Sequence, residues 1–273
     1  MHWILHSSGL LVAVIVLLFV ALVKCRECLK VDRRNILYLI MFGVFKFLMD
    51  YTFNQSLEDI PVSLATLLQN TAPYFVVILS YLFFREKTTK IVLLSIMIGT
   101  FGCALMTGNV MAGTKLDFMG IVFALISAFS LGMYFIGSDR SNRAGYSPVN
   151  YLFYVLLVAM IIAIPFADLG KITSNILEPG MVGNSLALGI GMTLIPFYIM
   201  TWSAKYLDAP TVSMICVLEI VFATFVGAFY FNETIGVQDY VGMALMIISI
   251  YIIGKESIGG EKNPTEMEEG SED

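Results

Sequence analysis

The stretch PVSLATLLQNTAPYFVVILSYLFF, residues 61–84, carries no charged residue and is long enough to cross a lipid bilayer. A helix rises about 1.5 Å per residue and the hydrocarbon core is about 30 Å thick, so about 20 apolar residues span it. Eight more stretches are about as long and predominantly apolar: Trp3–Val23, Asn35–Leu57, Ile91–Gly108, Phe118–Gly137, Pro148–Phe166, Val182–Ala204, Pro210–Phe231 and Val237–Gly254. Backbone N–H and C=O groups inside the lipid must hydrogen-bond to one another, because no water is present there. The sequence therefore predicts an all-α, polytopic membrane bundle of nine transmembrane helices.

The composition agrees with a membrane protein. Of the 273 residues, 58% are hydrophobic and only 14% are charged, and the mean hydropathy is +0.82. Such values are unusual for a soluble globule. The connections between the apolar stretches are short, which leaves no room for a soluble catalytic domain. The first stretch has no basic residue before its apolar run, so we interpret it as a retained span and not as a secretory signal.

The distribution of basic residues predicts the orientation. Lys and Arg of short loops concentrate on the cytoplasmic side of a membrane. Of the 16 Lys and Arg residues, thirteen lie in the loops after the first, third, fifth, seventh and ninth stretches, and two, Lys115 and Lys171, lie in the others. The N-terminus is therefore predicted outside and the C-terminus in the cytoplasm. We expect the plasma membrane as the location.

Neither the acidic C-terminal segment nor the cysteines indicate a bound cofactor. The formal net charge of -5 comes from residues 255–273, which we predict to form a disordered acidic cytoplasmic tail. Cys25 and Cys28 are close in sequence, but two thiols without further ligands do not make a zinc site. We expect no metal, no cofactor and no nucleic-acid partner.

An internal duplication is visible around two acidic residues, Glu86 and Glu233. Each follows an apolar stretch that opens with an Asp-x-Pro sequence, and each precedes a stretch with small residues at matching positions. Nine residues after the acid stand Ser95 and Gly242, and sixteen residues after it stand Gly102 and Ser249. The order of these features indicates two copies of one unit.

The two copies resemble the EamA-like repeat of the drug/metabolite transporter superfamily. The first copy matches through Ala72-Pro73, Glu86 and Gly102, and the second through Leu218-Glu219, Glu233 and Gly242. The second departs from the pattern because Ile220 stands where the family usually has proline, so the resemblance does not imply a kink there.

The resemblance implies a defined architecture. Similar proteins have ten helices in two five-helix repeats, and an odd number per repeat inverts the second copy relative to the first. Here residues 1–108 would form the first repeat with four helices, lacking the usual first one, and residues 109–254 the second with five. A ten-helix chain would begin and end in the cytoplasm. A chain that lacks the first of these helices would have its N-terminus outside, which is also the orientation that the loop charges predict.

The candidate site residues are polar groups at membrane depth, which usually face an internal cavity. Lys46, Asp50 and Asn54 are spaced by four residues and share one helix face. We expect them to meet a charged substrate or to exchange a proton; the alternative is a self-satisfied Lys46–Asp50 pair that only joins helices.

Further candidates lie on three other stretches. Gln69 and Asn70 precede Pro73, whose missing N–H frees a carbonyl, and they could bind substrate or join helices. Glu219 has no basic residue on its own stretch, so we expect it to be protonated, paired with Lys46 or hydrated, and to share a central cavity with Lys46 and Asp50. On the seventh stretch, Pro196 is predicted to bend the helix, whereas the aromatic side chains of Tyr198 and Trp202 could line a cavity or fill a core.

These observations predict a secondary transporter and not an enzyme. We expect alternating-access movement of a small metabolite, an amino acid or similar, in the export direction and with proton coupling. Nucleotide-sugar or sugar-phosphate exchange is the alternative within the superfamily. An intramembrane enzyme or a membrane scaffold is disfavoured, because the histidines, His2 and His6, lie at the N-terminus and no catalytic motif is present. Expected partners are the small-molecule substrate and membrane lipid, with a homodimer left open.

Overall fold

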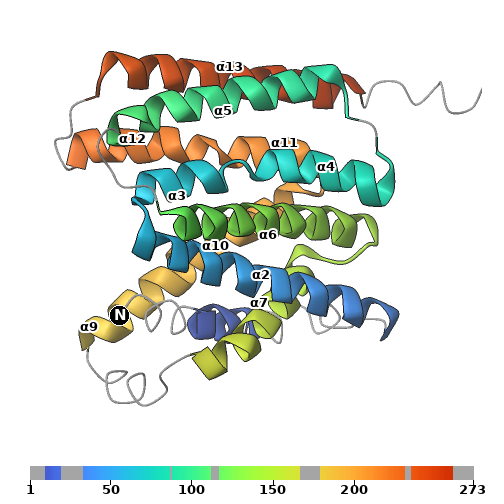
Figure 1. Ribbon diagram of the computed structural model, residues 1–273. Coiled ribbons are helices and arrows are strands. Elements are labelled where there is room, and N and C mark those ends of the chain that lie inside the picture. Colours follow the sequence, from blue (N-terminus) through green and yellow to red (C-terminus); the bar gives the residue numbers. More distant parts are fainter. Residues whose placement is uncertain are drawn as a thin grey trace, which may run out of the picture.

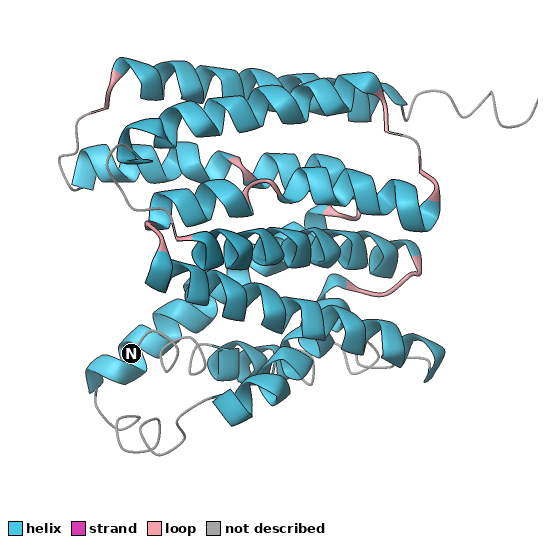
Figure 2. Cartoon of the chain, in the orientation of Figure 1, coloured by secondary structure: helices cyan, strands magenta, loops and turns pink. Residues whose placement is uncertain are grey.

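The structure, a computed structural model, describes residues 10–19, 33–86, 88–111, 117–166, 179–230 and 235–260. Throughout these segments the regular elements are helices, and no strand occurs among them (Figure 2). Seven helices are long and apolar enough to cross a membrane, and two shorter apolar helices, Leu10–Phe19 and Lys90–Met106, fall within the other two predicted spans. The predicted polytopic helical bundle is thus confirmed, whereas the total of nine spans stays a prediction.

The helices lie side by side in Figure 1. Besides the helix Leu10–Phe19, they are α2 (Arg33–Asp59), α3 (Val62–Gln69), α4 (Ala72–Phe84), α5 (Lys90–Met111), α6 (Phe118–Arg143), α7 (Pro148–Ala163) with η2 (Ile164–Phe166), α9 (Pro179–Leu186), η3 (Ala187–Leu194), α10 (Ile195–Ser203), α11 (Ala209–Cys216), α12 (Leu218–Tyr230) and α13 (Val237–Gly260).

Helix α6 runs through the middle of the bundle and packs against α2, α3 and α4 (Figure 1). Its stripe of small residues, Gly120, Ala124, Ala128 and Gly132, is buried. A Cβ atom on Gly132 would lie 3.1 Å from the Cβ of Phe75 on α4, and one on Gly120 would lie 2.8 Å from the Cβ of Asp59. The stripe therefore serves close helix packing within one chain, as such residues do in membrane bundles.

Two spans are interrupted near their middle. Between α3 and α4, the backbone N–H of Thr71 bonds to the carbonyl of Leu68 at 3.1 Å, and Pro73 lies in the first turn of α4. Between α11 and α12, Val217 forms the break, with its N–H bonded to the carbonyl of Met214 at 3.2 Å. The second break contains no proline. Asn70 and Val217 each lie sixteen residues before their acid, Glu86 or Glu233, so the breaks occupy equivalent positions.

The seventh span is irregular in another way. Its middle, η3, is a π-helix, and Pro196 lies in the first turn of the α-helix α10 that follows. π-Helical turns are rare and occur often at functional sites. This irregular segment lies beside the two helix breaks, because residues of all three segments line one cavity.

Candidate functional site

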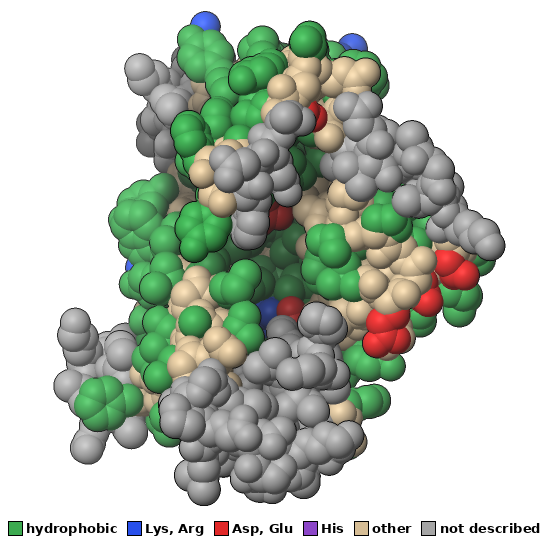
Figure 3. All heavy atoms as spheres, turned by 90° about the vertical axis from the view of Figure 1, so that its left-hand side faces the viewer, with side chains coloured by type: hydrophobic (Ala, Val, Ile, Leu, Met, Phe, Trp, Pro, Cys, Tyr) green, Lys and Arg blue, Asp and Glu red, His purple; other side chains and the backbone are tan. Residues whose placement is uncertain are grey.

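A cavity of about 400 Å³ lies where the interrupted spans meet η3 and α10. Its walls come from α2, α3, α4, α6, η3, α10, α11 and α12, through Met49, Gln69, Asn70, Ala72, Pro73, Leu131, Phe135, Gly191, Met192, Pro196, Phe197, Met200, Ser213, Cys216 and Glu219. Figure 3 shows the end of the bundle that carries the α2–α3 connection; this face is hollowed, with charged side chains visible inside the hollow. The volume suits a small metabolite, since ligand pockets usually occupy about 300 to 1,000 Å³.

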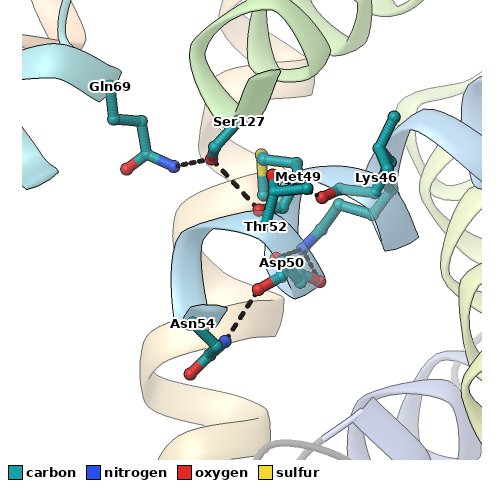
Figure 4. Close-up of polar contacts among 8 residues, drawn as sticks. Lys46, Met49, Asp50, Thr52, Asn54, Gln69 and Ser127 are labelled. Atoms are coloured by element: carbon teal, nitrogen blue, oxygen red, sulfur yellow. Dashed lines mark hydrogen bonds and ion pairs between the residues drawn. The ribbon is translucent and has the colours of Figure 1, made fainter. Parts of the chain in front are cut away.

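One polar part of the wall is built at the end of α3. The Gln69 side-chain Nε2 donates to the Oγ of Ser127 on α6 at 2.7 Å, and that hydroxyl donates to the carbonyl of Met49 on α2 at 3.0 Å (Figure 4). Gln69 is thereby held in position at the cavity by two other helices. The amide has donor and acceptor capacity beyond this one bond, so it is able to contact a polar ligand group.

The other polar part joins the two interrupted spans. The Nδ2 of Asn70 donates to the carbonyl of Thr66 at 2.9 Å, and the Asn70 amide lies beside the Glu219 carboxyl at the cavity. Glu219 lies in the first turn of α12, where the partial positive charge of a helix N-terminus stabilises an anion. Its side chain is exposed at the cavity, and no Lys or Arg within the described segments forms an ion pair with it.

Lys46 and Asp50 form an ion pair that contacts the cavity wall. The Nζ of Lys46 donates to the two carboxylate oxygens of Asp50 at 2.7 and 2.6 Å (Figure 4). Lys46 is only 1% exposed, and its ammonium lies 4.2 Å from the ring centroid of Phe197, a cavity residue. Asn54 donates to the backbone carbonyl of Asp50 at 2.8 Å. The predicted shared face exists, but these three residues stand outside the set that lines the cavity.

The remaining candidates separate into two groups. Pro73 and Pro196 line the cavity beside the helix break and the π-helix. Tyr198 and Trp202 do not, and they are 38% and 46% exposed. Trp202 instead packs edge-on against Tyr206, with ring centroids 5.2 Å apart. Glu233, the acid of the second copy, lies outside the described residues, as do Cys25 and Cys28.

Sequence reasoning missed the apolar part of the cavity. Phe135 and Phe197 supply aromatic walls, and three methionines and one cysteine supply sulfur: Met49, Met192, Met200 and Cys216. The ring of Tyr134 meets Phe197 edge-on at 5.1 Å, and its hydroxyl lies 2.7 Å from the Oγ1 of Thr201. In sequence these residues are indistinguishable from core residues, so no local signal marks them.

The end of the bundle opposite the hollow is held by ion pairs. Arg140, at the end of α6, lies 2.8 Å from the carboxylate of Glu86, which follows α4. Arg143 lies 3.3 Å from the same carboxylate and 3.0 Å from Asp139. The guanidinium of Arg140 also stacks 3.7 Å from the ring centroid of Phe84. These contacts join the α4 end to the α6 end.

Comparisons with known proteins place the chain in a family. A relative from Archaeoglobus fulgidus, named an uncharacterized transporter, is 29% identical over 232 residues, which cover 84% of this chain and 80% of that protein. The pseudopaline exporter CntI of Pseudomonas aeruginosa is 23% identical over 230 residues, covering 84% and 78%. A solved crystal structure shares the fold, with a TM-score of 0.74 at 16% identity over 95% of this chain and 89% of that one.

The profile of the EamA-like transporter family matches residues 5–108 and again residues 118–255. The family and the names of its members identify transporters and not enzymes. The apolar helices make the protein an integral, multi-pass membrane protein. The chain therefore belongs to the EamA-like transporter family of the drug/metabolite transporter superfamily, and it is a membrane transporter.

Proposed function

We propose that this protein is a secondary transporter that exports a small metabolite across the plasma membrane by alternating access. The observation that carries the proposal is the cavity at the two helix breaks, one in each segment that the family profile matches. Interrupted helices near the midplane supply unpaired backbone groups and helix ends to a substrate, and the interface of two repeats is where such sites form.

The two ends of the bundle support a two-state transport cycle. The end with the α2–α3 connection is hollowed (Figure 3), whereas the opposite end is joined by the Arg140–Glu86 ion pair. With the orientation proposed from the loop charges, the hollow opens to the outside and the ion pairs lie on the cytoplasmic side. Export is favoured by the name of one relative, an exporter, although that protein is only 23% identical.

Proton coupling is part of the proposal, with Glu219 as its candidate group. Glu219 is the carboxyl among the described cavity residues, and it lies beside Asn70 of the other half. Anionic substrates, such as nucleotide sugars or sugar phosphates, are disfavoured. The wall residues that the structure describes include no Lys or Arg, and Lys46, which contacts Phe197, is already neutralised by Asp50.

The proposal is tested by measuring metabolite transport through a variant whose cavity is blocked. Gly191 lines the cavity, and a Cβ placed on it would meet no atom within 4 Å, so Gly191→Trp adds a large side chain at the cavity without a clash at its Cβ. Gly183, in α9 of the same span, is equally uncrowded but does not line the cavity, so Gly183→Trp is the matched control.

Proteoliposomes are loaded with a metabolite extract, and the compounds that leave are identified by mass spectrometry. We expect specific compounds to leave through wild type and Gly183→Trp and to be retained by Gly191→Trp. Efflux that is no faster than in protein-free vesicles, with and without a pH gradient, would contradict transport by this chain.

A further inference from the structure

The charges around the cavity lead to a class of substrate. We propose that the cavity takes an organic amine in its ammonium form, with an apolar body, and that the Glu219 carboxylate pairs with the ammonium group. The proposal rests on the proposed function and names the substrate class for that cavity. A net positive charge on the substrate distinguishes it from an amino acid, which is a zwitterion.

The first argument is the charge of the wall. Among the described residues that line the cavity, Glu219 is the carboxylate, and no Lys, Arg or His accompanies it. Lys46, which contacts the wall residue Phe197, donates to both oxygens of Asp50 at 2.7 and 2.6 Å and is 1% exposed. The pair therefore contributes no net positive charge. The wall attracts cations, and it offers no cationic partner for a substrate carboxylate.

The second argument is the hydrogen-bonding capacity beside Glu219. An ammonium group has three donors and no acceptor, so it needs several oxygen acceptors at one place. Asn70 lies beside Glu219 on the cavity wall and uses its Nδ2 as a donor to the Thr66 carbonyl, which leaves the Oδ1 of the amide as an acceptor. Ser213 adds a hydroxyl oxygen to the wall. Its own hydrogen is donated to the carbonyl of Pro210 at 2.7 Å, so towards a ligand it is an acceptor. These groups match the donors of an ammonium.

The third argument is the remainder of the wall, which is apolar and aromatic. Phe135 and Phe197 come from α6 and α10, and Met192 and Met200 add flexible thioethers. Cations are attracted to aromatic faces, and Phe197 already receives the Lys46 ammonium at 4.2 Å. Phe135 also lines the cavity and carries no such contact with a described cation. An amine with an apolar body fits both parts of this wall.

The experiment compares three probes with the same phenyl ring and two-carbon chain: 2-phenylethylamine, phenylalanine and 3-phenylpropionate. They carry an ammonium, both charges and a carboxylate, respectively. Binding to the purified full chain is measured by calorimetry and by the shift of the melting temperature, because a ligand of the folded state stabilises it. We expect the amine to bind at least about tenfold more tightly than phenylalanine, about 1.4 kcal/mol, and 3-phenylpropionate not to bind.

Variants at two neighbouring positions separate charge from shape. Glu219→Gln should abolish amine binding, and Glu219→Asp, which keeps the charge, should retain the preference for the amine. In the double variant Glu219→Gln/Asn70→Asp the carboxylate moves to the neighbouring wall position, and amine binding should return. Glu58→Gln, which removes an exposed carboxylate outside the cavity, is the control and should bind like wild type.

Three outcomes would overturn the proposal: equal or tighter binding of phenylalanine or 3-phenylpropionate, amine binding that survives Glu219→Gln, or no binding of the amine to wild type. Each leaves the proposed function intact if metabolite efflux is still blocked by Gly191→Trp. Wild-type efflux no faster than that from protein-free vesicles, with amine binding unchanged, would instead refute transport and keep the amine site.

Discussion

Gly102 of α5 and Gly242 of α13 meet where their helices cross: a Cβ placed on Gly242 would lie 2.5 Å from the carbonyl oxygen of Gly102. A second contact joins the same helices, since the Oγ of Ser249 donates to the carbonyl of Ser95 at 2.7 Å. Each contact pairs a residue nine positions after its acid with one sixteen positions after the other acid. A two-fold axis between two copies produces this reciprocal pattern, which supports the proposal of inverted repeats at residues 1–108 and 109–254.

We predict that Gly242→Ala destabilises the protein by about 1 to 3 kcal/mol, because overpacking a tight contact forces backbone shifts. The added methyl group would meet the backbone oxygen of Gly102 and the Cγ of Met106, both at 2.5 Å. Gly254→Ala, on the same helix but with nothing within 4 Å, is the matched control and should be neutral or stabilising by up to about 1 kcal/mol. Unfolding in detergent measures both. Equal stability of the two variants would contradict the close crossing.

The ion pairs at the end of the bundle opposite the hollow lead to a prediction about access to the cavity from that end. Arg140 and Glu86 are 29% and 38% exposed, so their pair should stabilise the fold by only about 0 to 1 kcal/mol. If the pair holds this end closed, Glu86→Gln should leave stability nearly unchanged but raise the reaction rate of a cysteine at Met192, a cavity residue, with a thiol reagent added from that end.

The measurement uses a cysteine-free background carrying Met192→Cys in vesicles of one orientation. Glu58→Gln, at the other end, is the control. An unchanged labelling rate in Glu86→Gln would show that the ion pairs do not restrict access to the cavity.

The orientation proposed from the loop charges is tested with two exposed residues at opposite ends. Lys205 follows α10, and Glu58 lies near the end of α2. We expect a membrane-impermeant thiol reagent to label Glu58→Cys in intact cells, and to label Lys205→Cys only after the membrane is permeabilised. The reverse pattern would invert the orientation and assign the hollow in Figure 3 to the cytoplasmic side.

The sequence predicted the spans because a long apolar run in lipid has essentially one structural solution, a helix. It also predicted Pro73 as an irregular position, since a missing N–H is a local signal. The break at Val217 has no such signal. Helix α11 packs against α4 and α6, so tertiary contacts decide where it ends.

The orientation of side chains around a span could not be predicted in the same way. Phe197 lines the cavity, whereas its neighbour Tyr198 is exposed. In a soluble protein the polar face of a helix reveals its apolar core face, but a lipid-facing surface is as apolar as a protein core. The polar residues Gln69, Asn70 and Glu219 were identified because polar groups at membrane depth are rare. Lys46 and Asp50 were identified for the same reason, yet they pair with each other and are not among the residues that line the cavity.

The last prediction concerns Asp50, for which the sequence left a transport role and a structural role open. Because Lys46 is buried and donates to both carboxylate oxygens of Asp50, Asp50→Asn leaves a buried ammonium without its counter-charge. Removing one partner of a buried pair costs about 3 to 5 kcal/mol, whereas replacing both by apolar residues of similar volume is often neutral. We therefore expect Asp50→Asn to unfold at much lower temperature than wild type, and Lys46→Met/Asp50→Leu to recover most of the loss. Flux then separates the two roles: a double variant that is stable and transports normally assigns the pair to helix packing, and one that is stable but inactive assigns it to the transport cycle. Wild-type stability of Asp50→Asn would contradict the buried pair itself.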